Sequence, residues 1–132
     1  MYRMHRHKEV TPTEEWEVEY SDEFGLWWDS LTESEQDDVA AVVEVLQKVG
    51  PTLRRPLSGS IEGSRYPNMK ELVIQHAGSP YRVLYAFDPR RIAILLVGGN
   101  KTGNDRWYEE FVPQADRIYG DHLKAVEKEG LL

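Results

Sequence analysis

Between Pro80 and Tyr108 the sequence gathers side chains suited to binding or cutting a phosphodiester. Two apolar, β-branched runs flank a turn at residues 88–91, and a Gly-Gly-Asn-Lys loop follows them. Beside these runs lie three cations and a phenol, namely Arg82, Lys101, Arg106 and Tyr108. A buried hairpin has no need of such a set, whereas cations and hydrogen-bond donors are what a phosphate group requires. These residue types therefore indicate phosphodiester chemistry.

The charge of the chain is unevenly divided along the sequence. The net formal charge is −7, but residues 9–50 hold thirteen Asp or Glu and one Lys, whereas residues 65–106 hold seven Lys or Arg and three Asp or Glu. Asymmetry of this kind points to a partner surface. Carboxylates at residues 33–38 also favour a helix start, which explains part of the acidic excess.

Length and composition describe one globular domain without cysteine chemistry. The chain has 132 residues, of which 40% are hydrophobic and 30% charged, and this is enough for a single core. The lack of cysteine excludes disulfides, a thiolate nucleophile and cysteine-ligated metal sites, and it suits a reducing cytoplasm. No apolar run reaches membrane-spanning length. We expect a flexible N-terminal segment over residues 1–13, with no apolar signal core, and one domain over residues 14–132.

The apolar pattern predicts an α+β fold in the order β-α-α-β-β-β-α. Residues 14–20 alternate as a strand, and Glu33–Val49 repeats as a helix that begins with capping-box spacing at Thr32 and Glu35. The other elements expected are a short helix over 24–31, a loop over 52–67, strands over 70–76, 81–87 and 91–97, and a final helix from Asp105 that Pro113 kinks or divides. We expect a small, mostly antiparallel sheet with a helical hairpin on one face and a C-terminal helix, and with the other face open to a ligand.

Three segments resemble the RelE/HigB-type toxins of bacterial type II toxin–antitoxin systems, especially their phage-derived HigB-like branch. The segments are KELVIQH at 70–76, PYRVLYAFDPRR at 80–91 and ILLVGGNKTGNDRWYEEFVPQADRIY at 94–119, and the likeness spans roughly residues 16–123. The resemblance implies a RelE-like fold and a metal-independent endoribonuclease without a cofactor. Such toxins cleave messenger RNA, usually at the ribosome, and so inhibit translation in the cytoplasm. A cognate antitoxin neutralises them, and here we expect a HigA-like helix-turn-helix protein.

Carried over onto this sequence, the resemblance assigns four catalytic positions. They are Arg82 after the tyrosine of the central strand, Lys101 in the loop after the last strand, Tyr108 at the start of the final helix, and Lys70 before the Glu-Leu pair. Arg65, His76 and Arg106 are added as RNA-binding residues. One departure is Val73, because relatives commonly read Glu-Leu-Arg where this chain reads Glu-Leu-Val. One cation of the expected set is therefore missing.

The assigned residues fit metal-free RNA cleavage, in which the ribose 2′-hydroxyl attacks the neighbouring phosphate. The reaction needs a base near the 2′-oxygen, cations beside the phosphate and an acid for the departing 5′-oxygen. Arg82 suits a phosphate clamp through its planar fork, and Lys70 and Lys101 suit point charges. Tyr108 is expected to transfer a proton or stack on a base. His76 is a candidate general base because histidine titrates near neutrality.

Each of these assignments has a structural alternative. Arg82 can pair with Glu71 across the sheet. Tyr108 can pack in the core beside Trp107, and His76 can be a solvated turn residue. The four histidines lack metal-ligand spacing, and the loop at 98–101 lacks the frame of a P-loop. We therefore expect neither a metal site nor a nucleoside triphosphate site.

Two other functions stay open from the sequence. A ParE-like toxin of the same fold poisons gyrase without cutting RNA, but it has no chemical need for Arg82 together with Lys70 and Lys101. A relative that acts only as an interaction module is favoured by Val73 and by the acidic pI, since a ribosome-binding nuclease is more often basic. The cation set makes the ribonuclease our first prediction.

Overall fold

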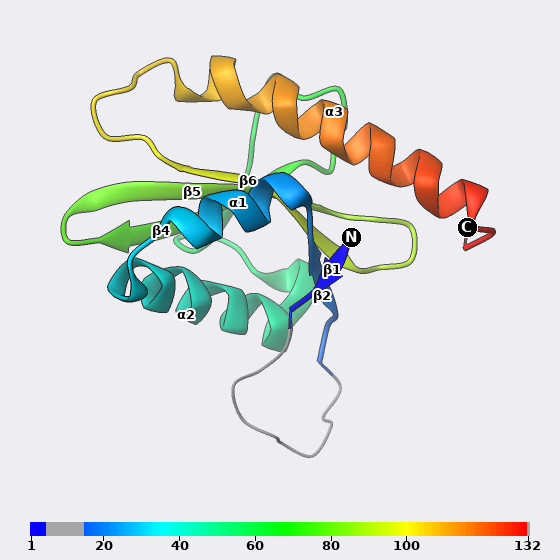
Figure 1. Cartoon of the computed structure of the whole chain (residues 1–132), viewed down its shortest axis with the longest axis horizontal. Coiled ribbons are helices and arrows are strands. Elements are labelled where there is room, and N and C mark those ends of the chain that lie inside the picture. Colours follow the sequence, from blue (N-terminus) through cyan, green and yellow to red (C-terminus); the bar gives the residue numbers. More distant parts are fainter. Residues whose placement is uncertain (5–14, 132) are drawn as a thin grey trace.

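The computed structural model describes residues 1–4 and 15–131. In chain order its elements are β1 (Tyr2–Arg3), β2 (Val18–Tyr20), α1 (Asp22–Ser30), α2 (Glu33–Val49), a 3-10 turn (Gly50–Thr52), β3 (Ser58–Ser60), β4 (Lys70–His76), β5 (Ser79–Phe87), β6 (Ala93–Asn100) and α3 (Trp107–Lys128). Figure 1 shows them as one sheet with helices on both sides. Most of the segment expected to be flexible, residues 1–13, lies outside the described residues, so that expectation stays a prediction.

The six described strands form one sheet in the order β1-β2-β6-β5-β4-β3. These strands pair antiparallel except for β2 and β6, which run parallel. The expected α+β architecture with a mostly antiparallel sheet is therefore confirmed. Two short strands were not expected, namely β1 and β3, and β3 lies within the segment 52–67 that was predicted to be a loop. Its three residues read Ser-Gly-Ser, so no apolar alternation reveals the strand.

Local side-chain chemistry fixes where α1 and α2 begin. The Ser21 hydroxyl accepts a hydrogen bond from the Phe24 amide at 3.0 Å, which caps α1. Thr32 and Glu35 form the expected capping box at the start of α2, with bonds of 2.8 and 3.2 Å. Gly50 ends α2 with a φ of 59°, a conformation that favours glycine. The helix predicted after the capping box is confirmed over its full length.

The sheet carries a hydrophobic core on each face (Figure 1). α1 and α2 cover one face, where Phe24, Leu46 and Tyr85 are buried. α3 covers part of the other face, where Leu84 and Trp107 are buried. The expectation of an open second face was wrong, because the amphipathic α3 buries its apolar side against β5 and β6.

The sequence predicted that Pro113 either kinks or divides the final helix. The structure shows that it does not divide it. α3 runs without interruption from Trp107 to Lys128. A proline inside a helix removes one backbone hydrogen bond. Here the flanking residues Val112 and Ala115 are buried against the sheet, so tertiary packing holds the turn in place.

Candidate active site

Four side chains, from β4, β5, the loop after β6 and the first turn of α3, meet beside the N-terminus of α3. The Tyr108 hydroxyl donates a hydrogen bond to Glu71 Oε1 at 2.5 Å. Arg82 Nε lies 3.3 Å from the same oxygen. The ammonium of Lys101 lies 4.9 Å from the centre of the Tyr108 ring, which is cation–π distance. We refer to Glu71, Arg82, Lys101 and Tyr108 as the Arg82 cluster.

Strand register explains why Glu71 and Arg82 share one side of the sheet. β4 and β5 pair antiparallel with Val73 directly opposite Arg82. Side chains alternate between the two faces along a strand, so Glu71, Val73 and Arg82 all point to the face that α3 covers. On its other side Arg82 pairs with Gly99 of β6, where the missing side chain makes room for the Trp107 ring. Val73, directly opposite Arg82 on the same face, therefore belongs to this site.

The loop after β6 and the start of α3 supply the other two members of the Arg82 cluster. The Lys101 amide donates to the Pro80 carbonyl at 2.9 Å, which ties this loop to the start of β5. Tyr108 is the second residue of α3. Its ring packs edge-on against the buried Trp107 ring, with centroids 5.2 Å apart. The core thus orients the helix end that carries the phenol.

The Arg82 cluster is largely closed, and its charges are paired. The Arg82 and Glu71 side chains are 14% and 9% exposed and form the cross-strand ion pair that the sequence offered as an alternative. Burial, and next the hydrogen bond to Glu71, raises the pKa of Tyr108 above its ordinary value. The phenol therefore stays protonated at neutral pH and acts as a donor. Within the described part of the chain, Arg82 Nε is one of two buried side-chain nitrogens without a hydrogen-bond partner, the other being Trp107 Nε1.

Two predicted site residues lie on the opposite face of the sheet. Lys70 and Glu71 are neighbours in β4, so their side chains point to opposite faces, and Lys70 falls on the side of α2. His76 is on that side as well, where its Nδ1 lies 2.7 Å from Asp38 Oδ2 in α2. The structure therefore separates Lys70 and His76 from the Arg82 cluster.

Arg65 and Arg106 are exposed loop residues. The Arg65 amide donates to the Asp116 carboxylate in α3 at 2.9 Å, which holds the loop before β4 against the helix. The Arg106 guanidinium lies 2.9 Å from Glu109 in the first turn of α3. No contact among the described residues joins either side chain to the Arg82 cluster, although Arg106 is close to Tyr108 in sequence.

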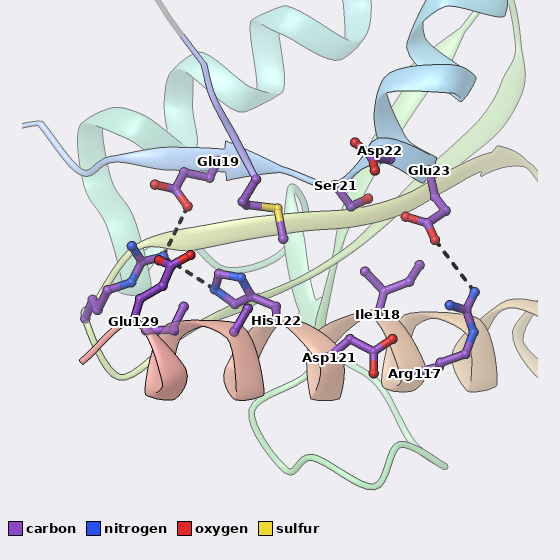
Figure 2. A pocket seen from close by; sticks show the side chains of 13 residues that line it. Glu19, Ser21, Asp22, Glu23, Arg117, Ile118, Asp121, His122 and Glu129 are labelled. Carbon is purple, nitrogen blue, oxygen red and sulfur yellow. Dashed lines mark hydrogen bonds and ion pairs between the residues drawn. The ribbon is translucent and has the colours of Figure 1, made fainter. Parts of the chain in front are cut away.

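A second polar cluster, which the sequence did not reveal, links β2 to the second half of α3 (Figure 2). The side chain of Asp88 is fully buried, and its Oδ2 lies 2.7 Å from Arg90 Nη2 and 2.8 Å from His122 Nε2. Arg90 also pairs with Glu19 of β2 at 3.1 Å. Glu19, Arg90 and His122 line part of a cavity of about 400 Å³ (Figure 2). We refer to Glu19, Asp88, Arg90 and His122 as the Asp88 network.

Hydrogen bonds keep Asp88 ionised although it is buried. Burial alone raises the pKa of Asp88, but the bonds from His122 and Arg90 outweigh it, so the pKa lies below the usual value. Burial lowers the pKa of Arg90, yet Asp88 and Glu19 raise it overall. Because these charges satisfy one another, we interpret the Asp88 network as a structural link between β2, the β5–β6 turn and α3.

The sequence analysis did not identify Glu71 or the Asp88 network as part of a site. The sequence suggested Glu71 only as a possible ion-pair partner of Arg82. Its contact with Tyr108 was not predicted, because that contact depends on where α3 crosses the sheet. His122 is buried in α3, and its partner Asp88 lies in the distant turn between β5 and β6. The described ranges hold no group of three His, Cys, Asp or Glu placed to hold a metal ion. Within residues 1–4 and 15–131, no helix combines the length and the apolar character that crossing a membrane requires.

The fold, with a helical hairpin on one sheet face and a C-terminal helix on the other, is the one expected of a small RelE/HigB-type toxin domain. The chain belongs to the family of phage-derived Gp49-like proteins (DUF891), whose family model matches residues 26–120. The resemblance to HigB-like toxins is thereby confirmed.

Two relatives from Mycobacterium tuberculosis (strain ATCC 25618 / H37Rv) illustrate the similarity. The chain is 43% identical over 103 residues to "Putative toxin HigB2". The matched region covers 76% of this chain and 51% of that protein. It is 44% identical over 92 residues to "Putative toxin HigB3". Here the matched region covers 69% of this chain and 79% of that protein. The match to the first relative thus spans about half of that protein's length.

Proposed function

We propose that this protein is the toxin of a type II toxin–antitoxin system and acts as a metal-independent endoribonuclease on messenger RNA at the ribosome. The observation that carries the proposal is the Arg82 cluster, which brings a guanidinium, an ammonium, a phenol and a carboxylate together. These are the groups that metal-free phosphodiester cleavage uses. The names of the two relatives support the toxin part of the proposal.

The cluster supports a distinct role for each cationic or phenolic side chain. Arg82 binds the scissile phosphate, since the planar fork of its guanidinium matches two phosphate oxygens. Lys101, beside the Tyr108 ring, stabilises the negative charge that develops on the phosphate. Tyr108 keeps its proton at neutral pH and so can donate it toward the departing 5′-oxygen.

The acidic and basic parts of the chain suit two different partners. RNA binds the basic part of the chain, residues 65–106, because phosphates attract cations. The acidic α2 is left for a protein partner, which we propose to be a HigA-like antitoxin with a helix-turn-helix domain. With these two proposed partners, we expect the protein to act in the cytoplasm.

A second candidate function is an interaction module without catalytic activity. The specific observation in its favour is that the apolar Val73 stands directly opposite Arg82, where the resemblance to the toxin family implies another cation. In addition, Glu71 neutralises the one guanidinium of the Arg82 cluster. The module and the nuclease differ in whether loss of Arg82 changes toxicity.

Expression without an antitoxin tests the proposal. Arg82→Ala and Lys101→Ala are each expected to relieve growth arrest, because each removes a positive charge at the phosphate. Lys48→Ala, which changes an exposed lysine of α2 far along the chain from the cluster, serves as the matched control and is expected to stay toxic. Equal toxicity of all three variants, at equal protein levels, would rule out the catalytic assignment.

A further inference from the structure

The proposed nuclease lacks a base for the ribose 2′-hydroxyl. The sequence offered His76 for this role, but His76 lies on the α2 face of the sheet and is bound to Asp38. Tyr108 cannot serve at neutral pH, because its raised pKa keeps the phenol protonated. The base must therefore be another group of the Arg82 cluster.

Glu71 is the carboxylate that the fold brings to this place. Its side chain is 9% exposed, and its Oε1 receives both the Tyr108 hydrogen bond and the contact with Arg82. No hydrogen bond to its Oε2 is found among the described residues. One oxygen thus fixes the orientation of the carboxylate, and the other is left for an incoming hydroxyl.

Other carboxylates near the start of α3 are arranged differently. Glu109 is exposed and paired with Arg106. Glu110 is exposed and accepts a hydrogen bond from the Asn104 amide. Neither makes a contact with Arg82 among the described residues. Proximity to the phosphate clamp thus singles out Glu71.

We propose that Glu71 is the general base of the reaction, an inference that rests on the proposed nuclease function. Glu71 Oε2 takes the proton of the 2′-hydroxyl while the 2′-oxygen forms a bond to phosphorus. The bond between phosphorus and the 5′-oxygen breaks, and the 5′-oxygen leaves with a proton supplied by Tyr108. The products are a 2′,3′-cyclic phosphate and a 5′-hydroxyl, so atoms and charges balance without a metal.

The Arg82 contact then has two uses. In the free protein the carboxylate satisfies the guanidinium, which would otherwise be a buried charge without a partner. When RNA binds, the phosphate takes over the guanidinium donors, and Glu71 remains next to the phosphate with Oε2 free. The ion pair seen across β4 and β5 thereby holds base and clamp at the spacing that the reaction needs.

Cleavage of ribosome-bound mRNA by purified variants tests this role. Glu71→Gln keeps the shape of the side chain but cannot take a proton at neutral pH, so the single-turnover rate is expected to fall by about 100-fold or more, with affinity for RNA kept. Glu71→Ala leaves space at the same place, and added acetate is expected to restore part of its rate but not that of Glu71→Gln. Glu44→Gln, on the exposed side of α2, is the matched control. Thermal unfolding of each variant checks that the fold is kept.

The outcomes separate this inference from the function on which it rests. If the wild type cleaves and Glu71→Gln cleaves at a similar rate, the base is another group while the nuclease stands. If Glu71→Gln is slow but acetate does not restore Glu71→Ala, the carboxylate is structural and the inference is wrong. If the wild type leaves the mRNA intact, the proposed function is overturned together with this assignment.

Discussion

Replacement of Asp88 by asparagine tests how the Asp88 network supports the fold. Asp88 Oδ2 faces the donors of Arg90 and His122, and Oδ1 accepts from the amides of Arg90 and Ile92. Asparagine can keep an oxygen for those amides, but it then turns its NH₂ group toward two other donors. Arg90 loses its nearest negative charge and keeps only Glu19 at 3.1 Å.

The size of the effect follows from burial. Removal of one partner of a buried ion pair typically costs about 3–5 kcal/mol. Because Arg90 keeps Glu19 and is 19% exposed, we expect the lower end, about 3 kcal/mol at neutral pH. For a domain of this size that corresponds to a fall in Tm of about 10 °C. The exposed Asp105 makes no ion pair in the described chain, so Asp105→Asn is the matched control with a change near zero.

The pH dependence adds a second readout. The folded-state pKa of Asp88 lies below its ordinary value, so its stabilisation is present above the pKa of the unfolded carboxyl and is lost as the pH falls through the folded-state pKa. Urea denaturation is therefore expected to separate wild type and Asp88→Asn at neutral pH, and the gap is expected to shrink below about pH 4. A variant as stable as wild type at neutral pH, or a gap that grows in acid, would refute the role assigned to this carboxylate.

Two further predictions concern packing and capping. Gly98→Ala should destabilise the protein by about 1–3 kcal/mol in thermal unfolding, because the added Cβ would lie 2.3 Å from the Trp27 ring on the α1 face; an unchanged Tm would mean that Trp27 moves freely. Thr32→Ala should cost about 1 kcal/mol in urea denaturation, because it removes the capping-box hydroxyl that accepts from Glu35. An unchanged urea midpoint would contradict the capping role of this hydroxyl.

The parts of the fold that follow from local sequence were predicted well. α2 was predicted from a capping box and a helical apolar period, and both act within a few residues. β3 and β1 were missed because two or three residues carry no period, and their pairing depends on a partner strand elsewhere in the chain. The sequence also did not predict that α3 covers the second face of the sheet, because a helical apolar pattern does not show which surface the helix packs against.

The candidate site was predicted in part. Register parity decides which strand residues share a face, and parity explains why Arg82 meets Glu71 while Lys70 points away. Residue types and the family resemblance selected Arg82, Lys101 and Tyr108, and the structure brings these three together. The partner of Tyr108 could not be predicted, because it requires the crossing position of α3 on the sheet.

We propose that this chain cuts translated messenger RNA, and mapping of mRNA 5′ ends after induction decides whether it does. Wild-type protein is expected to create new 5′ ends inside translated codons within minutes of induction, whereas Arg82→Ala at the same protein level should not. Growth arrest by the wild type without new ends inside codons would contradict the account, and a DNA-damage response in those cells would point instead to a gyrase-poisoning toxin.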